Sequence, residues 1–138
     1  MLVLVDTNIL VYAFDPAQGE KHTVALRICR ELLEQDRLCL STQVLQELYL
    51  TLTRKARIPV DTAVSVLDDL SEWPIFSVDF RAVRQAALIA RDHRLSYWDA
   101  LLVAAANRLG ATILLTEDLN HGQMIAGVEI QNPFQGPG

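Results

Sequence analysis

Short apolar runs alternate with segments of helical periodicity along almost the whole chain. The runs span residues 2–5, 38–40, 74–78, 113–115 and 128–130. Continuous apolar runs of this length are typical of strands buried on both faces of a parallel sheet. Parallel strands need crossover connections, which are usually helical and right-handed. The alternation therefore predicts a three-layer α/β fold with a parallel sheet of about four or five strands flanked by helices.

The segments between these runs have helical spacing and carry signals for helix ends. Ser41 or Thr42 can cap one helix, and Asp79 and Ser96 can cap two later ones. Gly110 suits a helix end because glycine adopts the left-handed conformation without strain. The expected helices cover residues 9–14, 22–35, 42–55, 61–70, 80–93 and 97–110.

Length and composition indicate one compact domain. With 138 residues and 51% hydrophobic residues the chain can bury its own core, so we expect one domain over 1–134 and a loose tail at 135–138. Cys29 and Cys39 do not form a Cys-x-x-Cys pair, and reduced thiols are expected. No signal peptide is expected, since the first apolar run soon meets an acid, and no stretch approaches the roughly 18 apolar residues of a membrane span. The chain is therefore predicted to be cytoplasmic.

The net charge of −5 argues against a protein that coats nucleic acid nonspecifically, because such proteins are basic. It does not argue against a nuclease. Carboxylates that hold a metal ion add to the negative charge of the sequence, yet they form a positive site once the ion is bound.

Four acidic residues stand at structural transitions. Asp6 and Asp118 each follow an apolar run by one to three residues, Asp99 lies in the first turn of a predicted helix, and Glu47 lies in the second turn of another. Ligands of open parallel sheets bind outside the carboxyl ends of the strands. We therefore expect these acids to lie at one edge of the sheet.

Each acid also has an ordinary structural explanation. Asp6 could cap the first helix, Asp99 could complete a capping box with Ser96, Glu47 could be a solvated helix residue, and Asp118 could belong to a turn. Asp6 is the hardest to explain in this way, because a carboxylate directly after a buried strand is poorly solvated.

Taken together, the four acids predict a site for a hard divalent cation. Two carboxylates about 4 Å apart repel each other by roughly 4 kcal/mol at an effective dielectric constant of 20. Oxygen ligands favour Mg²⁺ or Mn²⁺ over zinc. Such an ion can activate a water molecule for attack on a phosphoryl group. Asn8 and Thr116 could orient ligands or waters.

The ordered motifs resemble those of PIN-domain ribonucleases, in particular the VapC-like toxins of prokaryotic toxin–antitoxin pairs. The resemblance covers nearly the whole chain. It is carried by Val5-Asp6-Thr7-Asn8, Gln46-Glu47, Ser96-Tyr97-Trp98-Asp99-Ala100, Leu115-Thr116-Glu117-Asp118-Leu119 and the segment 127–134.

The resemblance implies that Asp6, Glu47, Asp99 and Asp118 are both the catalytic residues and the ligands of Mg²⁺ or Mn²⁺. It also implies three supporting residues, Thr7, Asn8 and Thr116. Glu117 is at the variable middle position of the Thr-x-Asp pattern, so Asp118 is the expected ligand, and Glu117 could contribute if the turn permits.

The predicted function is a metal-dependent endoribonuclease that cleaves RNA phosphodiester bonds with a metal-activated water. The resemblance further implies a toxin that is neutralised by an antitoxin protein and forms a homodimer. Residues 44–52 and 64–70 are candidate partner surfaces that core burial explains equally well. Two alternatives remain open: an acidic-site phosphatase or phosphotransfer domain, and a non-catalytic PIN-like binding module.

Other residues admit two interpretations. Tyr97 and Trp98 could stack on a base, but we expect them to pack in the core. None of the three histidines shows metal-ligand spacing, and none is predicted to be a catalytic base. The basic residues could contact RNA phosphates, but for most of them a solvated helix face, with cations at a helix C-terminus, is the favoured interpretation; they are Arg54, Lys55, Arg57, Arg81, Arg84, Arg91 and Arg94.

Overall fold

The computed structural model describes residues 1–135 and contains one six-stranded sheet in the order β3-β2-β1-β4-β6-β5. All neighbouring strands are parallel except β5, which runs antiparallel to β6. The predicted α/β fold with a parallel sheet is confirmed. The strands are β1 (Val3–Val5), β2 (Leu38–Ser41), β3 (Ile75–Phe76), β4 (Ile113–Leu115), β5 (Met124–Ile125) and β6 (Val128–Gln131).

Two short strands differ from the sequence prediction. β3 forms only two residues of the expected run 74–78, because only Ile75 and Phe76 are in register with β2. β5 was not predicted. Its two residues pair with the start of β6 across a tight turn at Ala126 and Gly127, both of which have positive φ.

The helices match the predicted segments with small shifts at their ends. α2 begins two residues earlier than expected, and α4 begins at Val60 because Pro59 occupies its N-cap position. A short 3₁₀ turn, η1 (Pro16–Gln18), precedes α2. The helices are α1 (Thr7–Phe14), α2 (Glu20–Glu34), α3 (Thr42–Arg54), α4 (Val60–Leu70), α5 (Phe80–His93) and α6 (Tyr97–Leu109).

Hydrogen bonds at the helix ends explain why these segments are helical. The side chains of Ser41, Asp79 and Ser96 accept hydrogen bonds from backbone N–H groups of the first turns of α3, α5 and α6. Gly110 ends α6 with φ of 74°, and its N–H donates to the carbonyl groups of Ala106 and Asn107. These predicted caps are confirmed.

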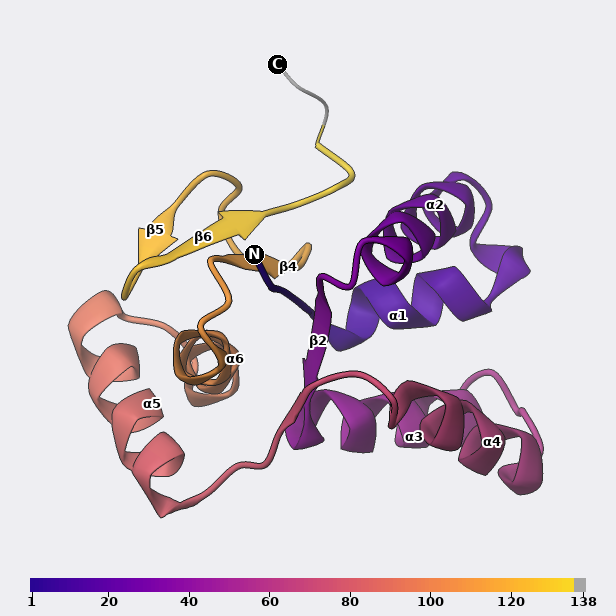
Figure 1. The fold of residues 1–138 in the computed structure, drawn as a ribbon, viewed down its shortest axis with the longest axis horizontal. Helices are drawn as coiled ribbons and strands as arrows, with labels where there is room; N and C mark the ends of the chain where they lie inside the picture. The colour runs from indigo at the N-terminus through magenta and orange to yellow at the C-terminus, as the bar shows by residue number, and fades with distance from the viewer. Residues whose placement is uncertain (136–138) are drawn as a thin grey trace.

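The core surrounds the central strand β1, which lies between β2 and β4. Leu4 is in register with Cys39 on one side and Leu114 on the other, and all three are fully buried. α1 and α2 lie on one side of the sheet and α5 and α6 on the other, which gives the three layers (Figure 1). This burial on both faces explains the uninterrupted apolar run of β1.

None of the helices in the part of the chain that the structure describes is both long and apolar enough to cross a bilayer. The tail expected at 135–138 falls, apart from Gln135, outside the described residues.

Candidate active site

A cleft of about 480 Å³ opens at the carboxyl ends of β1 and β4. Because these strands are neighbours, the segments that follow them meet: the backbone N–H of Asp6 donates to the carbonyl of Leu115 at 2.9 Å. Three of the four predicted acids therefore line one cleft. Its described lining residues are Asp6, Thr7, Asn8, Val11, Tyr12, Asp15, Gln18, Glu47, Thr51, Lys55, Ala56 and Asp118.

Asp6 is the most buried of the four acids, with 4% of its surface exposed. Its carboxylate accepts hydrogen bonds from the Thr7 N–H at 2.6 Å and from the Thr116 hydroxyl at 2.7 Å. The pKa of Asp6 is raised from 3.8 to about 6: burial is the main cause, the two hydrogen bonds oppose the rise, and the nearby charges of Asp118 and Glu47 add to it. Asp6 also caps α1, so the ordinary explanation and a functional role coexist here.

Asp118 is held by contacts from two elements. Its carboxylate accepts a hydrogen bond from the Asn8 side chain at 3.0 Å, and its backbone N–H donates to the Thr116 hydroxyl at 3.1 Å. Burial raises the pKa of Asp118, and the charge of Asp99 raises it further. Asp99 lies in the first turn of α6 and is not a lining residue of the cleft, but it is close enough for its charge to act on Asp118.

Glu47 is held through both of its carboxylate oxygens, one by α1 and the other by a residue of its own helix α3. The Thr7 hydroxyl donates to Oε2 at 3.0 Å, and the Gln43 amide donates to Oε1 at 3.1 Å. The same Gln43 nitrogen donates to the carbonyl of Trp98 at 3.2 Å, one residue before Asp99. Sequence reasoning missed Gln43, although its position one helical turn before Glu47 on α3 was a usable signal.

The donor chemistry of the four acids fits a hard divalent cation. All the side-chain donors are carboxylate oxygens, and none of the ion pairs among residues 1–135 compensates any of these four charges. Within the same residues, no three His, Cys, Asp or Glu side chains are already arranged to hold a metal ion. The hydrogen bonds from Thr7, Asn8 and Thr116 instead hold the carboxylates at their separate positions.

A family model described as the PIN domain matches residues 3–124. The chain belongs to the PIN domain family. It is 32% identical over 126 residues to Ribonuclease VapC23 of Mycobacterium tuberculosis, in a match that covers 85% of this chain and 93% of the relative.

Solved structures with under 25% identity share the fold of this PIN domain. A toxin–antitoxin complex from Klebsiella pneumoniae matches with a TM-score of 0.71 and 19% identity, over 96% of this chain and 98% of the other. Mycobacterium tuberculosis VapC20, a toxin that cleaves the sarcin–ricin loop, matches with a TM-score of 0.63 and 22% identity, over 81% of this chain and 86% of the other.

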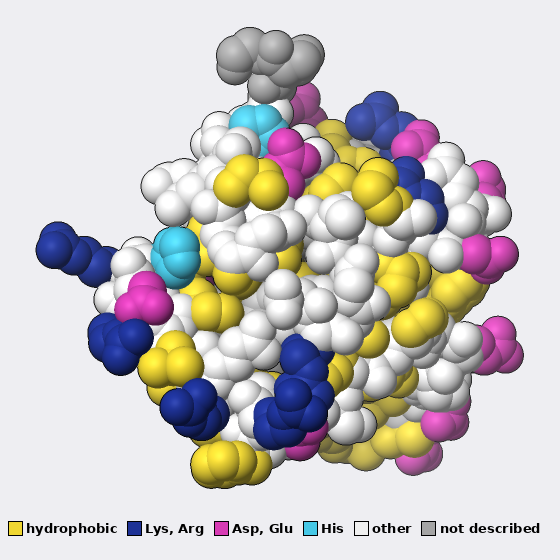
Figure 2. Space-filling model, turned by 60° about the vertical axis from the view of Figure 1, so that its left-hand side comes forward, with side chains coloured by type: hydrophobic (Ala, Val, Ile, Leu, Met, Phe, Trp, Pro, Cys, Tyr) yellow, Lys and Arg dark blue, Asp and Glu magenta, His cyan; other side chains and the backbone are white. Residues whose placement is uncertain are grey.

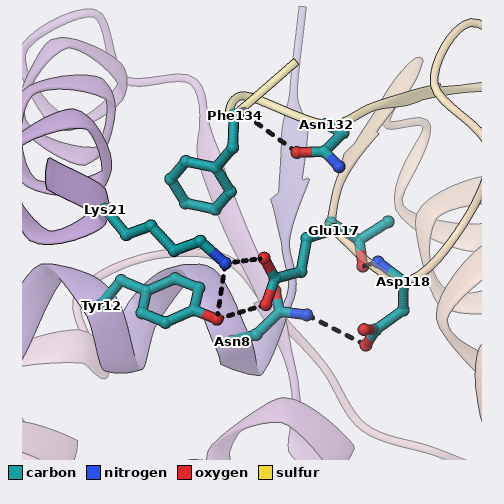
Figure 3. A network of polar contacts seen from close by, with 8 residues as sticks. Asn8, Tyr12, Lys21, Glu117, Asp118, Asn132 and Phe134 are labelled. Carbon is teal, nitrogen blue, oxygen red and sulfur yellow. Dashed lines mark hydrogen bonds and ion pairs between the residues drawn. The ribbon is translucent and has the colours of Figure 1, made fainter. Parts of the chain in front are cut away.

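Glu117 of this PIN domain points away from its neighbour Asp118, toward α1 and α2 (Figure 3). Its carboxylate forms an ion pair with Lys21 at 2.9 Å and accepts a hydrogen bond from the hydroxyl of Tyr12. The Lys21 ammonium also lies over the rings of Tyr12 and Phe134, at 5.0 and 5.2 Å from their centroids. Burial acts to raise the pKa of Glu117, but the contacts with Tyr12 and Lys21 outweigh it and lower the pKa overall.

The aromatic residues at the start of α6 have different environments. Tyr97 packs against the core, as predicted, but Trp98 is 63% exposed, so the prediction that it packs in the core is wrong. Adjacent residues at a helix start face different directions, and only Tyr97 faces the interior. The rings of Trp98 and Tyr97 meet edge to face, 5.1 Å apart.

The arginines of α5 lie on its solvent side. Lys and Arg side chains gather, among apolar ones, on the face of the molecule turned forward in Figure 2. Arg81, Arg84 and Arg91 are exposed, and Arg91 pairs with Asp92 at 2.8 Å. Their exposure agrees with the favoured interpretation of a solvated helix face.

Proposed function

We propose that this PIN domain, residues 1–134, is a divalent-metal-dependent endoribonuclease and the toxin of a toxin–antitoxin pair. One observation carries the proposal: three acids from separate segments line the cleft at the carboxyl ends of β1 and β4, the charge of a fourth, Asp99, acts on Asp118, and none of the four has a compensating ion pair among residues 1–135. The likeness to Ribonuclease VapC23 supports RNA as the substrate. Membership of the PIN domain family favours this function over a phosphotransfer domain.

The proposed catalytic and metal-binding residues are Asp6, Glu47, Asp99 and Asp118, and the proposed ion is Mg²⁺ or Mn²⁺. When bound, such an ion polarises a phosphoryl oxygen and lowers the pKa of water. The protein's own contribution is to orient three of these carboxylates, through hydrogen bonds from the supporting residues Thr7, Asn8 and Thr116 to Glu47, Asp118 and Asp6 respectively. Glu117 supports the loop before Asp118 rather than binding the ion, because Lys21 and Tyr12 engage its carboxylate.

The cleft also contains a group suited to the substrate backbone. Lys55, which follows α3, is the one cation among its described lining residues. An exposed lysine can neutralise a phosphate next to the one that is cleaved. Unstacked RNA is the proposed substrate, because its backbone is accessible in loops and single strands.

Cleavage of a labelled single-stranded RNA tests this proposal. Wild type should cleave with Mg²⁺ or Mn²⁺ and stop cleaving in EDTA, while Asp6→Asn and Asp99→Asn should lose at least a hundredfold in rate. Asp69→Asn, which changes an exposed acid of α4, is the matched control and should keep full activity. Cleavage that survives EDTA, or equal rates for Asp6→Asn and wild type, would contradict the metal site.

The proposed partners are an antitoxin protein and a second copy of the chain, in the cytoplasm, where the two free cysteines stay reduced. The candidate surfaces at 44–52 and 64–70 are mixed: Val44, Leu48 and Leu52 are in the core, while Leu50 and Val64 are 42% and 43% exposed. Light scattering of the purified chain tests the homodimer. A mass twice that of the 15.4-kDa chain supports it, and the mass of a single chain contradicts it.

A further inference from the structure

Gln43 is a polar side chain buried beside the proposed metal site. It lies in the first turn of α3 and has 6% of its surface exposed. Its amide nitrogen donates to Glu47 Oε1 and to the carbonyl oxygen of Trp98, at 3.1 and 3.2 Å. Its amide oxygen has no hydrogen-bond partner among the described residues. Buried polar side chains without an evident folding role are candidates for a functional one.

The two acceptors determine which way the Gln43 amide points. If the amide were reversed, its oxygen would face a carboxylate oxygen and a carbonyl oxygen, and both contacts would be repulsive. With the nitrogen toward Glu47 and Trp98, each N–H finds an acceptor. The amide oxygen is left to accept a hydrogen bond from a water molecule or from a group that enters the site.

Gln43 connects two acids that are far apart in the sequence. Glu47 is exposed, so its long side chain would otherwise sample many rotamers. Thr7 binds one of its carboxylate oxygens and Gln43 binds the other, which holds the carboxylate from two sides. Through the Trp98 carbonyl, the same amide ties Glu47 to the first turn of α6, which contains Asp99.

We propose that Gln43 is a positioning residue of the metal site, which orients Glu47 and sets its place relative to Asp99. The inference rests on the proposed function and adds a residue to it. Orienting the ligand before the ion arrives removes part of the entropic cost of binding. Loss of a residue that orients a metal ligand typically lowers metal affinity by tenfold or more.

Titration calorimetry with Mn²⁺ tests the proposal on the whole chain. Gln43→Met keeps the length of the side chain but removes the donors, and it should weaken Mn²⁺ binding about tenfold. Gln46→Met makes the same chemical change at an exposed position of the same helix and should bind like wild type. Equal affinities for Gln43→Met and wild type would overturn the role of Gln43 while leaving the metal site intact.

A double-mutant cycle separates positioning from a general structural role. If Gln43 acts through Glu47, then Gln43→Met should change Mn²⁺ affinity less than twofold in a Glu47→Gln background. A tenfold loss in both backgrounds would show that the substitution perturbs the site in some other way, and would overturn the proposal. Absence of Mn²⁺ binding by wild type would remove the proposed metal site itself, a result distinct from both.

NMR of the wild-type side-chain amide gives a measurement that does not require Gln43→Met to fold. In metal-free protein both Gln43 amide protons should exchange slowly with solvent, because both are hydrogen-bonded and buried. Glu47→Ala should shift these resonances and speed the exchange of one proton. Fast exchange in wild type, or no response to Glu47→Ala, would contradict the inference.

Discussion

Replacing Asp6 with asparagine should change how the stability of the metal-free protein depends on pH. Asparagine has nearly the same shape, so its oxygen can still accept from the Thr7 N–H. Its NH₂ group can donate to the Thr116 hydroxyl in place of the carboxylate oxygen. What changes is the charge. Asp6 must ionise in a buried position, whereas the asparagine side chain of the Asp6→Asn variant does not titrate.

The size of the effect follows from the raised pKa of Asp6. The pKa of the carboxyl group is 3.8 in the unfolded chain and about 6 in the folded protein, a difference that corresponds to roughly 3 kcal/mol. At pH values between 3.8 and about 6, the folded state binds more protons than the unfolded state. The stability that protonated Asp6 contributes is therefore fully present below pH 3.8 and is lost as the pH rises through about 6.

Urea denaturation in EDTA at several pH values measures this difference. From about pH 4 to pH 8, the free energy of unfolding of wild type should fall by roughly 2 kcal/mol more than that of Asp6→Asn. The control Asp69→Asn should follow wild type, because it removes an exposed charge on α4. Mn²⁺ at pH 8 should stabilise wild type and not Asp6→Asn. Parallel profiles for wild type and Asp6→Asn would refute the argument from burial.

Two further predictions concern the Glu117 cluster and the core. Lys21→Met should raise the pKa of Glu117, because it removes the ion pair at 2.9 Å; an NMR titration in which that pKa does not move would show that Lys21 does not lower it. Leu4→Ala should lower the free energy of unfolding in urea by about 2–5 kcal/mol, because Leu4 is fully buried in the central strand. Leu50→Ala, at a position that is 42% exposed, should cost less than about 1 kcal/mol, and equal losses would contradict this view of the core.

Patterns of a few residues were enough to predict most of the fold. The apolar runs of β1 and β4 are short continuous segments, and the caps Asp79 and Ser96 bind backbone groups three residues away. Such local features can be recognised from the sequence alone. The two-residue strand β5 could not be predicted in this way. Met124 is 59% exposed, and its pairing depends on the position of β6.

The general location of the site also followed from the sequence, because acids after parallel strands lie at one edge of the sheet. The position of β1 beside β4 did not follow from it, and that order brings the segments after the two strands together. The direction of Trp98 was predicted wrongly, because a residue at a helix start can face the core or solvent.

The sequence alone determined the residue types of the proposed site: four acids and the order in which they occur. Only the tertiary structure decided which partners the neighbouring acids Glu117 and Asp118 contact. Asp118 faces Asn8, whereas Glu117 faces Tyr12 and Lys21, residues about a hundred positions earlier in the chain. The physical reason is that a side chain's direction follows from the partners that satisfy its charge, and these partners come from other elements of the fold.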